Sequence, residues 1–469
     1  MNPFLNPTTG LPLLKHFLFD ESRLRRMSIK QVERYRDKAL KKIVKYAYTV
    51  PIYNKKYKEL GIHPNDIKGI QDIKKLPYIT KKELAENFPD DVVPQSYNKN
   101  RAQIVSTGGS TGKPISIYTD FYLFSESIGA PLRLFHSLNL NFRKLKMANI
   151  GTFFPNRAGH EVQKAVYSKL PFFSNFRNRL NINAFDPIKE IIDKLDDFKP
   201  DFILSYPVTF QNLAYLKNKG YGKNIKPKIL ESSGYILDEY TRRYVQDAFG
   251  CRMLSVYGSV EGYSEAPIAF ECLEGIWHIN YDFFHIETIN ENMELIGPNK
   301  RGHIVVTKLF GRCEPIIRYT GMDDWVTLSP IYKCKCGLCT PIFKDGVEGR
   351  ISSSVVLPNG IIYPGASFDV VSLVLNEFKP RKIKRFQIVQ KKIDEIEILL
   401  VIDEDLRNVG PSVDLLFKKI KERYDKKIGS DIKIDIREVE ENEIKSSPFK
   451  PAPLVISYLT QEDREKVLY

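Results

Sequence analysis

The sequence predicts an α/β fold, in which a large, multi-layered N-terminal domain with a mostly parallel sheet (residues 1–350) precedes a small α+β domain (residues 351–469). Three observations support this prediction. The chain has 469 residues, which leaves room for two or three domains. Short apolar strand patterns alternate with helical patterns in its middle part, as in parallel sheets. The pattern then changes near Gly275 and again near Arg350.

Residues 1–100 are expected to form a helical lead-in to the N-terminal domain. Apolar residues recur at helical spacing over 32–48, shortly before Pro51. A further helix is predicted in the segment 77–88, where Thr80 is a suitable N-cap.

The alternating region follows this lead-in. Its expected strands cover 147–154, 201–207, 226–234 and 251–258. Its expected helices cover 160–170, 187–198, 209–220 and 238–250. Beyond Gly275, residues 277–289 and 302–309 alternate as antiparallel strands do.

In the C-terminal domain, we expect a hairpin over 385–403, a helix over 410–429 and a strand over 431–440, in a βαβ arrangement. We expect this domain to be mobile and to act as a lid, on the resemblance described below.

The composition is that of an ordinary globular protein, with 42% hydrophobic and 27% charged residues. The net charge of +14 is spread along the chain and forms no arginine-rich arm, so a general surface character is favoured over nucleic-acid binding. No run approaches 18 apolar residues, and six cysteines are too few for a disulfide scaffold. A cytoplasmic protein without a membrane span is therefore expected.

The segment Ser106-Thr107-Gly108-Gly109-Ser110-Thr111-Gly112-Lys113 predicts a phosphate-binding loop. Glycines allow backbone N–H groups to approach an anion, hydroxyl groups add donors, and Lys113 adds a positive charge. The spacing differs from that of a Walker loop, because only three residues separate Gly108 from Gly112 and Pro114 follows the lysine. A P-loop NTPase is excluded, and an ordinary surface turn is the remaining alternative.

Three further motifs lie at expected strand ends or turns. Tyr257-Gly258-Ser259-Val260-Glu261 follows an apolar strand, where open α/β sheets place their ligands, and its carboxylate suits Mg²⁺ near phosphate. The acidic turn after Arg318 contains Asp323, which suits a ribose diol. Arg350 follows later, and its guanidinium suits phosphate or ribose. Each motif alone is also compatible with an ordinary turn.

The order of these motifs resembles the adenylate-forming ligases, and within them the phenylacetate–coenzyme A ligase branch and its capsule-biosynthesis relatives. The series runs through the phosphate loop, Glu231-Ser232-Ser233-Gly234, the Tyr257 to Glu261 motif, Arg318 to Asp324, Gly349-Arg350 and a C-terminal segment that contains Lys445 and Lys450. The resemblance covers nearly the whole chain, including the lead-in.

The resemblance implies roles for individual residues. Ser106 to Lys113 would hold the β- and γ-phosphates of ATP, and Glu261 would bind Mg²⁺. Ser233, Gly234 and Tyr257 would line the adenine and acyl pockets, with Gly258 and Ser259 beside them. Asp323 would take the ribose hydroxyls, and Arg350 would lie at the hinge. The catalytic lysine would be Lys450, with Lys445 as the alternative.

Three positions depart from the family pattern: Tyr235 replaces a glutamate, Ser352-Ser353 replace a hinge aspartate, and Phe449 precedes the C-terminal lysine. These departures concern the adenine contacts, the hinge and the lysine assignment. Aromatic side chains that suit the wall of an acyl pocket are Phe153, Phe154, Tyr206, Tyr235 and Tyr263.

A cluster of thiols predicts a zinc site. Zn²⁺ prefers four tetrahedral Cys or His ligands, which two hairpins often supply in pairs. Members of the resembled branch carry a site of this kind. We expect Cys272, His278, Cys334 and Cys336 as structural ligands, with Cys339 as a substitute for Cys336; the alternative is a set of incidental buried thiols.

The expected function is ATP-dependent activation of a carboxylate to acyl-AMP with release of pyrophosphate. An aromatic acid is one candidate for this carboxylate. The acyl group would pass to coenzyme A or to an amine or hydroxyl acceptor, as in surface polysaccharide biosynthesis. Two alternatives stay open: a zinc-containing basic nucleic-acid-binding protein, and an adenylating fold that binds nucleotide without catalysis.

Overall fold

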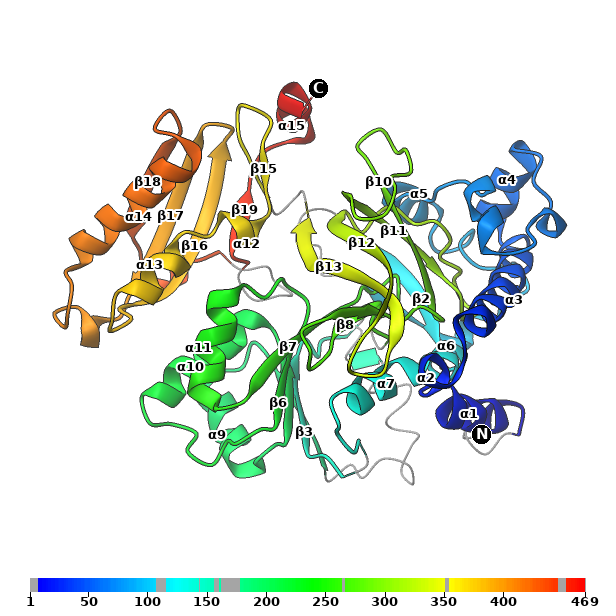
Figure 1. Cartoon of the computed structure of the whole chain (residues 1–469), viewed down its shortest axis with the longest axis horizontal. Coiled ribbons are helices and arrows are strands. Elements are labelled where there is room, and N and C mark those ends of the chain that lie inside the picture. Colours follow the sequence, from blue (N-terminus) through cyan, green and yellow to red (C-terminus); the bar gives the residue numbers. More distant parts are fainter. Residues whose placement is uncertain are drawn as a thin grey trace.

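The computed structural model describes residues 7–106, 115–142, 144–155, 160–161, 178–263, 266–350, 354–445 and 453–468. Its central feature is a mixed sheet of eleven strands in the order β10-β11-β12-β13-β9-β8-β7-β6-β5-β3-β4 (Figure 1). A separate four-stranded sheet belongs to the C-terminal part of the chain. The predicted α/β class is confirmed.

Half of the large sheet is parallel, as the alternating pattern predicted. Its strands are β3 (Met147–Gly151), β4 (Arg179–Asn183), β5 (Phe202–Ser205), β6 (Ile229–Ser232) and β7 (Arg252–Tyr257). The helices between them are α9 (Ile188–Phe198), α10 (Pro207–Asn218) and α11 (Glu239–Phe249). These helices pack their apolar side chains on one face of the parallel strands. Of the expected helix over 160–170, only residues 160–161 lie within the described residues.

The other half of the sheet is antiparallel. Its strands are β8 (Ala269–Glu271), β9 (Trp277–Ile279), β10 (Phe284–Ile289), β11 (Arg301–Lys308), β12 (Asp324–Lys333) and β13 (Cys339–Arg350). Strand β7 pairs in parallel with β6 and antiparallel with β8. The strand direction therefore switches beside Tyr257.

The lead-in is helical, as predicted. Its helices are α1 (Pro7–Phe19), α2 (Arg23–Arg26), α3 (Ile29–Ala47), α4 (Pro51–Glu59) and α5 (Lys81–Asn87). Thr80 caps α5 as expected, because its side chain accepts from the backbone N–H of Glu83. The hairpin of β1 (Ala102–Ser106) and β2 (Ser116–Asp120) follows, and then α6 (Phe121–Ser127) and α7 (Gly129–Ser137). None of the helices in the described residues is long and apolar enough to cross a membrane.

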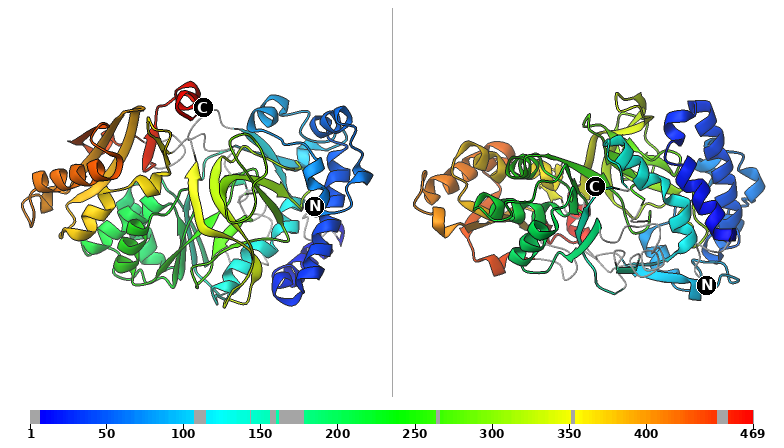
Figure 2. Two further views of the ribbon diagram at one scale, coloured as in Figure 1. Left: turned by 45° about the horizontal axis from the view of Figure 1, so that its top comes forward. Right: turned by 90° about the horizontal axis from the view of Figure 1, so that it is seen from below.

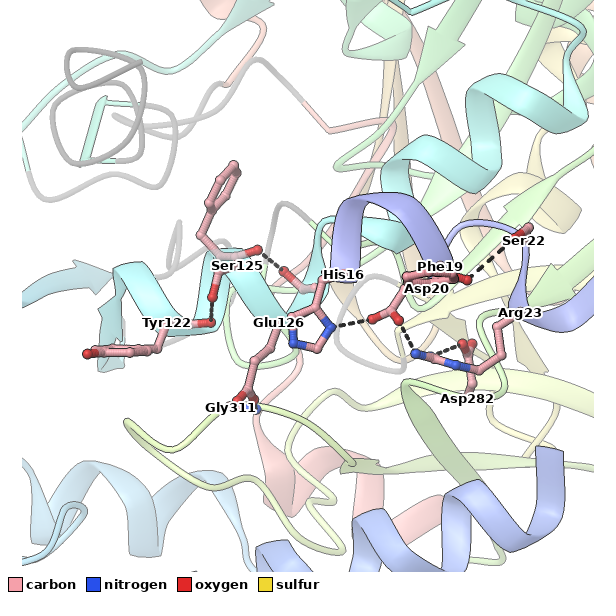
Figure 3. Close-up of polar contacts among 12 residues, drawn as sticks. His16, Phe19, Asp20, Ser22, Arg23, Tyr122, Ser125, Glu126, Asp282 and Gly311 are labelled. Carbon is pink, nitrogen blue, oxygen red and sulfur yellow. Dashed lines mark hydrogen bonds and ion pairs between the residues drawn. The ribbon is translucent and has the colours of Figure 1, made fainter. Parts of the chain in front are cut away.

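A buried ionic network ties the lead-in to the sheet (Figure 3). The Asp282 carboxylate accepts from Arg23 Nη1 at 2.6 Å and from both terminal nitrogens of Arg133 at 2.8 and 2.9 Å. Asp20 pairs with Arg23 and with His16. Burial alone would raise the pKa of Asp282, but Arg133 and Arg23 hold it below its usual value.

The C-terminal unit, residues 354–445 and 453–468, has an apolar core to which Tyr240 of α11 also contributes. Its elements are β14 (Val355–Val356), β15 (Ile362–Tyr363), α12 (Gly365–Phe368), α13 (Val371–Glu377), β16 (Ile383–Lys392), β17 (Glu395–Ile402), α14 (Val413–Ile428), β18 (Lys433–Glu438), β19 (Val455–Ser457) and α15 (Gln461–Leu468). Strands β16 and β17 form the predicted hairpin, and α14 connects β17 to the parallel β18. The predicted βαβ arrangement is therefore confirmed.

The C-terminal unit lies beside α10 and α11, at the opposite end of the molecule from the lead-in helices (Figure 2). Tyr215 of α10 donates to Asp403 at 2.8 Å. The Arg381 guanidinium lies 4.4 and 4.0 Å from the ring centroids of Tyr240 and Tyr244 of α11. Asp369 accepts from the backbone N–H of Ser372 in the first turn of α13, and Asp238, the N-cap of α11, is close enough to raise the pKa of Asp369. The contact surface is thus largely polar and aromatic.

We predict that Asp282→Asn lowers the stability of the protein by about 3–5 kcal/mol, because it leaves two buried guanidinium groups without a charged partner. Thermal unfolding should show a midpoint lower by several degrees. Glu86→Gln, in an exposed ion pair with Lys82, is the control and should change the midpoint little. Equal midpoints for Asp282→Asn and the wild type would contradict the role of the network.

A second prediction concerns pH. Burial, together with Asp238, raises the pKa of Asp369 from 3.8 to about 7. The folded protein thus keeps a proton that the unfolded chain releases, so this group makes the free energy of unfolding fall from about pH 4 to about pH 7. Asp369→Asn has no such proton, so its melting temperature relative to wild type should be higher at pH 8 than at pH 5. The exposed Asp431→Asn is the control; parallel pH profiles for Asp369→Asn and wild type would contradict the assignment.

Candidate active site and metal centre

The candidate active site begins where the parallel strands end. Strand β5 is followed by Tyr206, β6 by Ser233, Gly234 and Tyr235, and β7 by Gly258. The backbone N–H of Ser233 donates to the carbonyl of Ser205 at 3.0 Å, which extends the ladder one residue past β6. Carboxyl ends of adjacent parallel strands meet at one edge, which is where open α/β sheets bind ligands.

Gly234 permits a close approach of two strand-end loops. Its φ is +80°, and a Cβ at this position would lie 2.8 Å from the ring of Tyr206. The Tyr206 and Tyr235 rings lie 6.1 Å apart in an edge-to-face arrangement, and the Tyr206 hydroxyl contacts Thr152 Oγ1 at 3.0 Å. Tyr235, which replaces the glutamate of the family pattern, therefore makes an aromatic contact with Tyr206.

The other aromatic candidates for an acyl pocket are Phe153, Phe154 and Tyr263. Phe153 lies near Gly151 at the end of β3, and Phe154 packs on Phe185 at 5.8 Å. Tyr263 is buried in the largest apolar cluster. The structure thus brings Tyr206 and Tyr235 together and places Tyr263 in the core.

Glu261 lies in the turn after β7, and its side chain is only 6% exposed. Ser259 caps this turn, because its hydroxyl accepts from the N–H of Gly262 at 2.9 Å. Tyr319 donates to Glu261 Oε1 at 3.0 Å. The hydroxyl contact orients one oxygen of the carboxylate.

Asp324 joins two other predicted residues. Its Oδ2 accepts from the Tyr257 hydroxyl at 2.7 Å, and its Oδ1 lies 3.7 Å from Arg350 Nε. The Asp324 carboxylate raises the pKa of Arg350. Asp323, the expected ribose ligand, has φ +58°, is 44% exposed and lies 3.8 Å from His303 Nδ1.

The sequence did not single out Tyr319 or Asp324. Their position in the same acidic turn as Asp323 was the available signal. Tyr257, Glu261, Tyr319, Asp324 and Arg350 together form what we call the carboxylate cluster. The cluster combines two carboxylates, two phenols and a guanidinium, a set that can hold a divalent cation and a phosphate or diol.

The predicted phosphate loop is placed by its flanks. Ser106 ends β1, and its hydroxyl contacts that of Ser116 on β2 at 2.8 Å. Positions Thr107 to Lys113 lie outside the described residues, as do Lys450 and the departures Ser352, Ser353 and Phe449. The segment between Ser106 and Ser116 therefore connects the two strands of a hairpin.

The four expected zinc ligands converge. The Sγ atoms of Cys272, Cys334 and Cys336 and a ring nitrogen of His278 all lie within 4.8 Å of one another. Cys272 Sγ is 3.8 Å from Cys334 Sγ, and Cys336 Sγ is 3.3 Å from His278 Nε2. Thr340 Oγ1 lies 2.9 Å from His278 Nδ1, so it orients the ring as second partners of ligating histidines do.

This donor set fits a closed tetrahedral Zn²⁺ site, since it supplies three sulfurs and one imidazole nitrogen. Cys272 and His278 come from the hairpin of β8 and β9, and the other two come from the turn between β12 and β13. Cys339, the expected substitute for Cys336, starts β13 and is not in the cluster.

Comparisons with known proteins agree with the fold. No protein-family model matches the chain. A phenylacetate–coenzyme A ligase from Thermus thermophilus is 24% identical over 428 residues, which cover 86% of this chain and 90% of the relative. Protein CapK from Staphylococcus aureus is 25% identical and covers 74% of each chain. The solved structure of 2-hydroxyisobutyryl-CoA ligase with 2-HIB-AMP matches with a TM-score of 0.75 at 18% identity, over 95% of this chain and 93% of that one.

The chain is thus similar over most of its length to phenylacetate–coenzyme A ligases and to CapK, and it has the fold of 2-hydroxyisobutyryl-CoA ligase. Phenylacetate–coenzyme A ligases from other bacteria match at a similar level, among them that of Escherichia coli at 25% identity. The resemblance expected from the motifs is thereby confirmed.

Proposed function

We propose that the chain activates a carboxylate with ATP, forms an acyl-AMP and pyrophosphate, and then transfers the acyl group to an acceptor. The observation that carries this proposal is the carboxylate cluster, which lies at the strand ends of an adenylate-forming fold. The names of the relatives support coenzyme A as the acceptor. An amine or hydroxyl acceptor, as in surface polysaccharide synthesis, is a narrower version of the same proposal.

In the first step, the substrate carboxylate attacks the α-phosphorus and pyrophosphate leaves. Glu261 would hold Mg²⁺, which offsets the charge of the phosphates when bound. The segment Ser106 to Lys113 would donate to the β- and γ-phosphates. Asp323 would accept from the ribose hydroxyls, and Arg350 would face phosphate or ribose while Asp324 holds it.

Tyr206 and Tyr235 would line the acyl pocket beside Ser233 and Gly234. Their edge-to-face contact leaves an aromatic wall at the strand ends. Aromatic walls suit a flat or apolar acid, which supports an aromatic carboxylate as substrate.

We further propose that the chain divides after Arg350 into a large domain and a lid that brings Lys450 to the α-phosphate. The C-terminal unit has its own sheet and an apolar core, which supports this division. The Lys445 ammonium donates to the Tyr458 hydroxyl at 2.6 Å within the same unit, which supports Lys450 rather than Lys445 as the catalytic lysine.

The cysteine and histidine cluster is proposed to hold one structural Zn²⁺. All four ligand positions are filled by protein atoms, which leaves no place for a substrate. The ion would connect the hairpin of β8 and β9 to the turn between β12 and β13, and would supply stability to the antiparallel half of the sheet.

The experiment that tests the main proposal is a carboxylate-library screen for ATP–pyrophosphate exchange. Exchange with a subset of acids is expected, whatever the acceptor. Nucleotide binding without exchange for any acid would instead indicate an adenylating fold that has lost catalysis.

Glu261→Gln should lower Mg²⁺-dependent pyrophosphate exchange by about 10²-fold or more and leave the protein folded, because it removes a charge that faces the metal but little volume. The exposed Glu291→Gln is the matched control. Unchanged exchange at limiting Mg²⁺ would refute the assignment of Glu261.

Metal analysis of the purified protein should find about one zinc per chain. Cys334→Ser should lower both the zinc content and the melting temperature, while Cys251→Ser, outside the cluster, should change neither. A purified protein that contains no zinc and keeps its full stability would contradict the assignment of a structural zinc site.

Lys450→Ala should lower adenylate formation by about 10²-fold or more, since the lysine would stabilise charge only in the transition state. Transfer from pre-made acyl-AMP should change far less, because the lid would have rotated. Lys445→Ala is the matched control. A larger defect in Lys445→Ala would move the catalytic role to that residue.

A further inference from the structure

A buried group of charged side chains lies beneath the hairpin that carries the expected phosphate loop. Lys308, Glu314 and Asp120 are 1%, 2% and 7% exposed. The Lys308 ammonium interacts electrostatically with both carboxylates. Asp120 has structural partners, because it caps α6 through Leu123 and accepts from the Tyr97 hydroxyl. The role of Glu314 is not explained by such a cap.

Glu314 instead contacts the backbone of the hairpin. Its Oε2 accepts from the N–H of Tyr118 at 2.9 Å, and its Oε1 has no hydrogen-bond partner among the described residues. Tyr118 lies on β2 opposite Ile104, two residues from the Ser106 and Ser116 pair. An N–H that donates to a side chain outside the hairpin is not used in the ladder between its strands.

This contact matters because, among the described residues, no further strand pairs with the hairpin. Strands β1 and β2 form a two-stranded sheet separate from the large sheet. Such hairpins are only marginally stable without external contacts. Glu314 is thus one of the groups that fix the hairpin to the rest of the domain.

The same segment of chain holds the carboxylate cluster. Five residues after Glu314, Tyr319 donates to Glu261, and its backbone exchanges two hydrogen bonds with Val306 of β11. Glu314 therefore connects the hairpin to the strand segment that orients the expected Mg²⁺ ligand.

From this geometry, and resting on the proposed function, we propose that Glu314 is a positioning residue that sets the phosphate-binding hairpin relative to Glu261, with Lys308 as the buried counter-charge. The ligand that it positions is the triphosphate of the nucleotide. Neither residue touches the substrate in this proposal, and both act through the backbone of β2.

The test compares two double variants that differ in a single acceptor. Lys308→Met/Glu314→Gln keeps an oxygen for the Tyr118 N–H, whereas Lys308→Met/Glu314→Met has a side chain of similar length without one. Both remove the charge pair together, since a single substitution would leave one buried charge unpaired. Lys308→Met/Glu314→Leu replaces the Met variant if that variant does not fold.

In pyrophosphate exchange, the Met variant should raise KM for ATP about 10-fold relative to the Gln variant, the scale of one hydrogen bond, with KM for the carboxylate unchanged. Without nucleotide, backbone hydrogen exchange in residues 115–120 should be about 10-fold faster in the Met variant. Equal hydrogen exchange and equal KM for ATP in the two variants would overturn the proposal.

The hydrogen-exchange measurement needs neither ATP turnover nor a carboxylate. If the wild-type protein shows no ATP–pyrophosphate exchange, the proposed function is refuted. The backbone hydrogen exchange of residues 115–120 would still test whether Glu314 positions the hairpin. A rise of KM for the carboxylate equal to that for ATP would also overturn the proposal, because it would indicate general loss of structure.

Discussion

The carboxylate of Asp282 connects three parts of the chain that are far apart in sequence. It receives hydrogen bonds from Arg23 of the lead-in and Arg133 of α7, and it stands just before β10 of the antiparallel half-sheet. Helix α7 in turn packs Leu134 and Phe135 in one apolar cluster with residues of the parallel strands. Because Asp282, Arg23 and Arg133 are all buried, the removal of any one of them leaves a buried charge without its partner. This contact therefore adds to the pairing of β7 with β8 in holding the two half-sheets in position.

That position determines the candidate site, because the site lies where the two half-sheets meet. Strand β7 is the last parallel strand and the first with an antiparallel neighbour. Tyr257 at its end reaches Asp324 at the start of β12, while Glu261 reaches Tyr319. Residues separated by about sixty positions thus meet at one switch in strand direction. A shift between the half-sheets would separate the phenols from their carboxylates.

The sequence predicted those features that depend on local patterns. Strands β3, β5, β6 and β7, the helices α9 to α11 and the hairpin of β16 and β17 have short periodic signals, whereas the parallel strand β4 was not predicted. Thr80 was predictable as a cap because its own side chain forms the capping hydrogen bond. The zinc ligands were predictable because thiols are rare in this chain and their spacing is compact. The hairpin of β1 and β2 was not predicted, because its strands have five residues each and flank a glycine-rich segment. The long pair β12 and β13 was missed as well, because register shifts break its alternation.

Within the site, sequence reasoning found residues but not their partners. Glu261 and Tyr257 belong to one motif, yet each hydrogen-bonds to a residue of another motif more than fifty positions away. Local periodicity carries no information on such contacts. The roles of Asp323 and Lys450 stay predictions, since the first rests on a ligand that must approach an exposed side chain and the second lies outside the described residues.

The contacts of the C-terminal unit differ in kind from the Asp282 network. Tyr215 of α10 donates to the buried Asp403, and Lys219, the C-cap of that helix, donates to the exposed Asp405. The exposed ion pair adds little net free energy, and the hydrogen bond to Asp403 adds about 1 kcal/mol. Such an interface suits the proposed lid, which must separate from α10 and α11 and bind them again. The buried Asp282 network suits elements whose relative position does not change. The interface also depends on protonation at Asp238 and Asp369. These two buried carboxylates are close together, so one of them must keep its proton. If the unit rotates as proposed, the population of this arrangement falls as the pH rises through the pKa of Asp369, near 7.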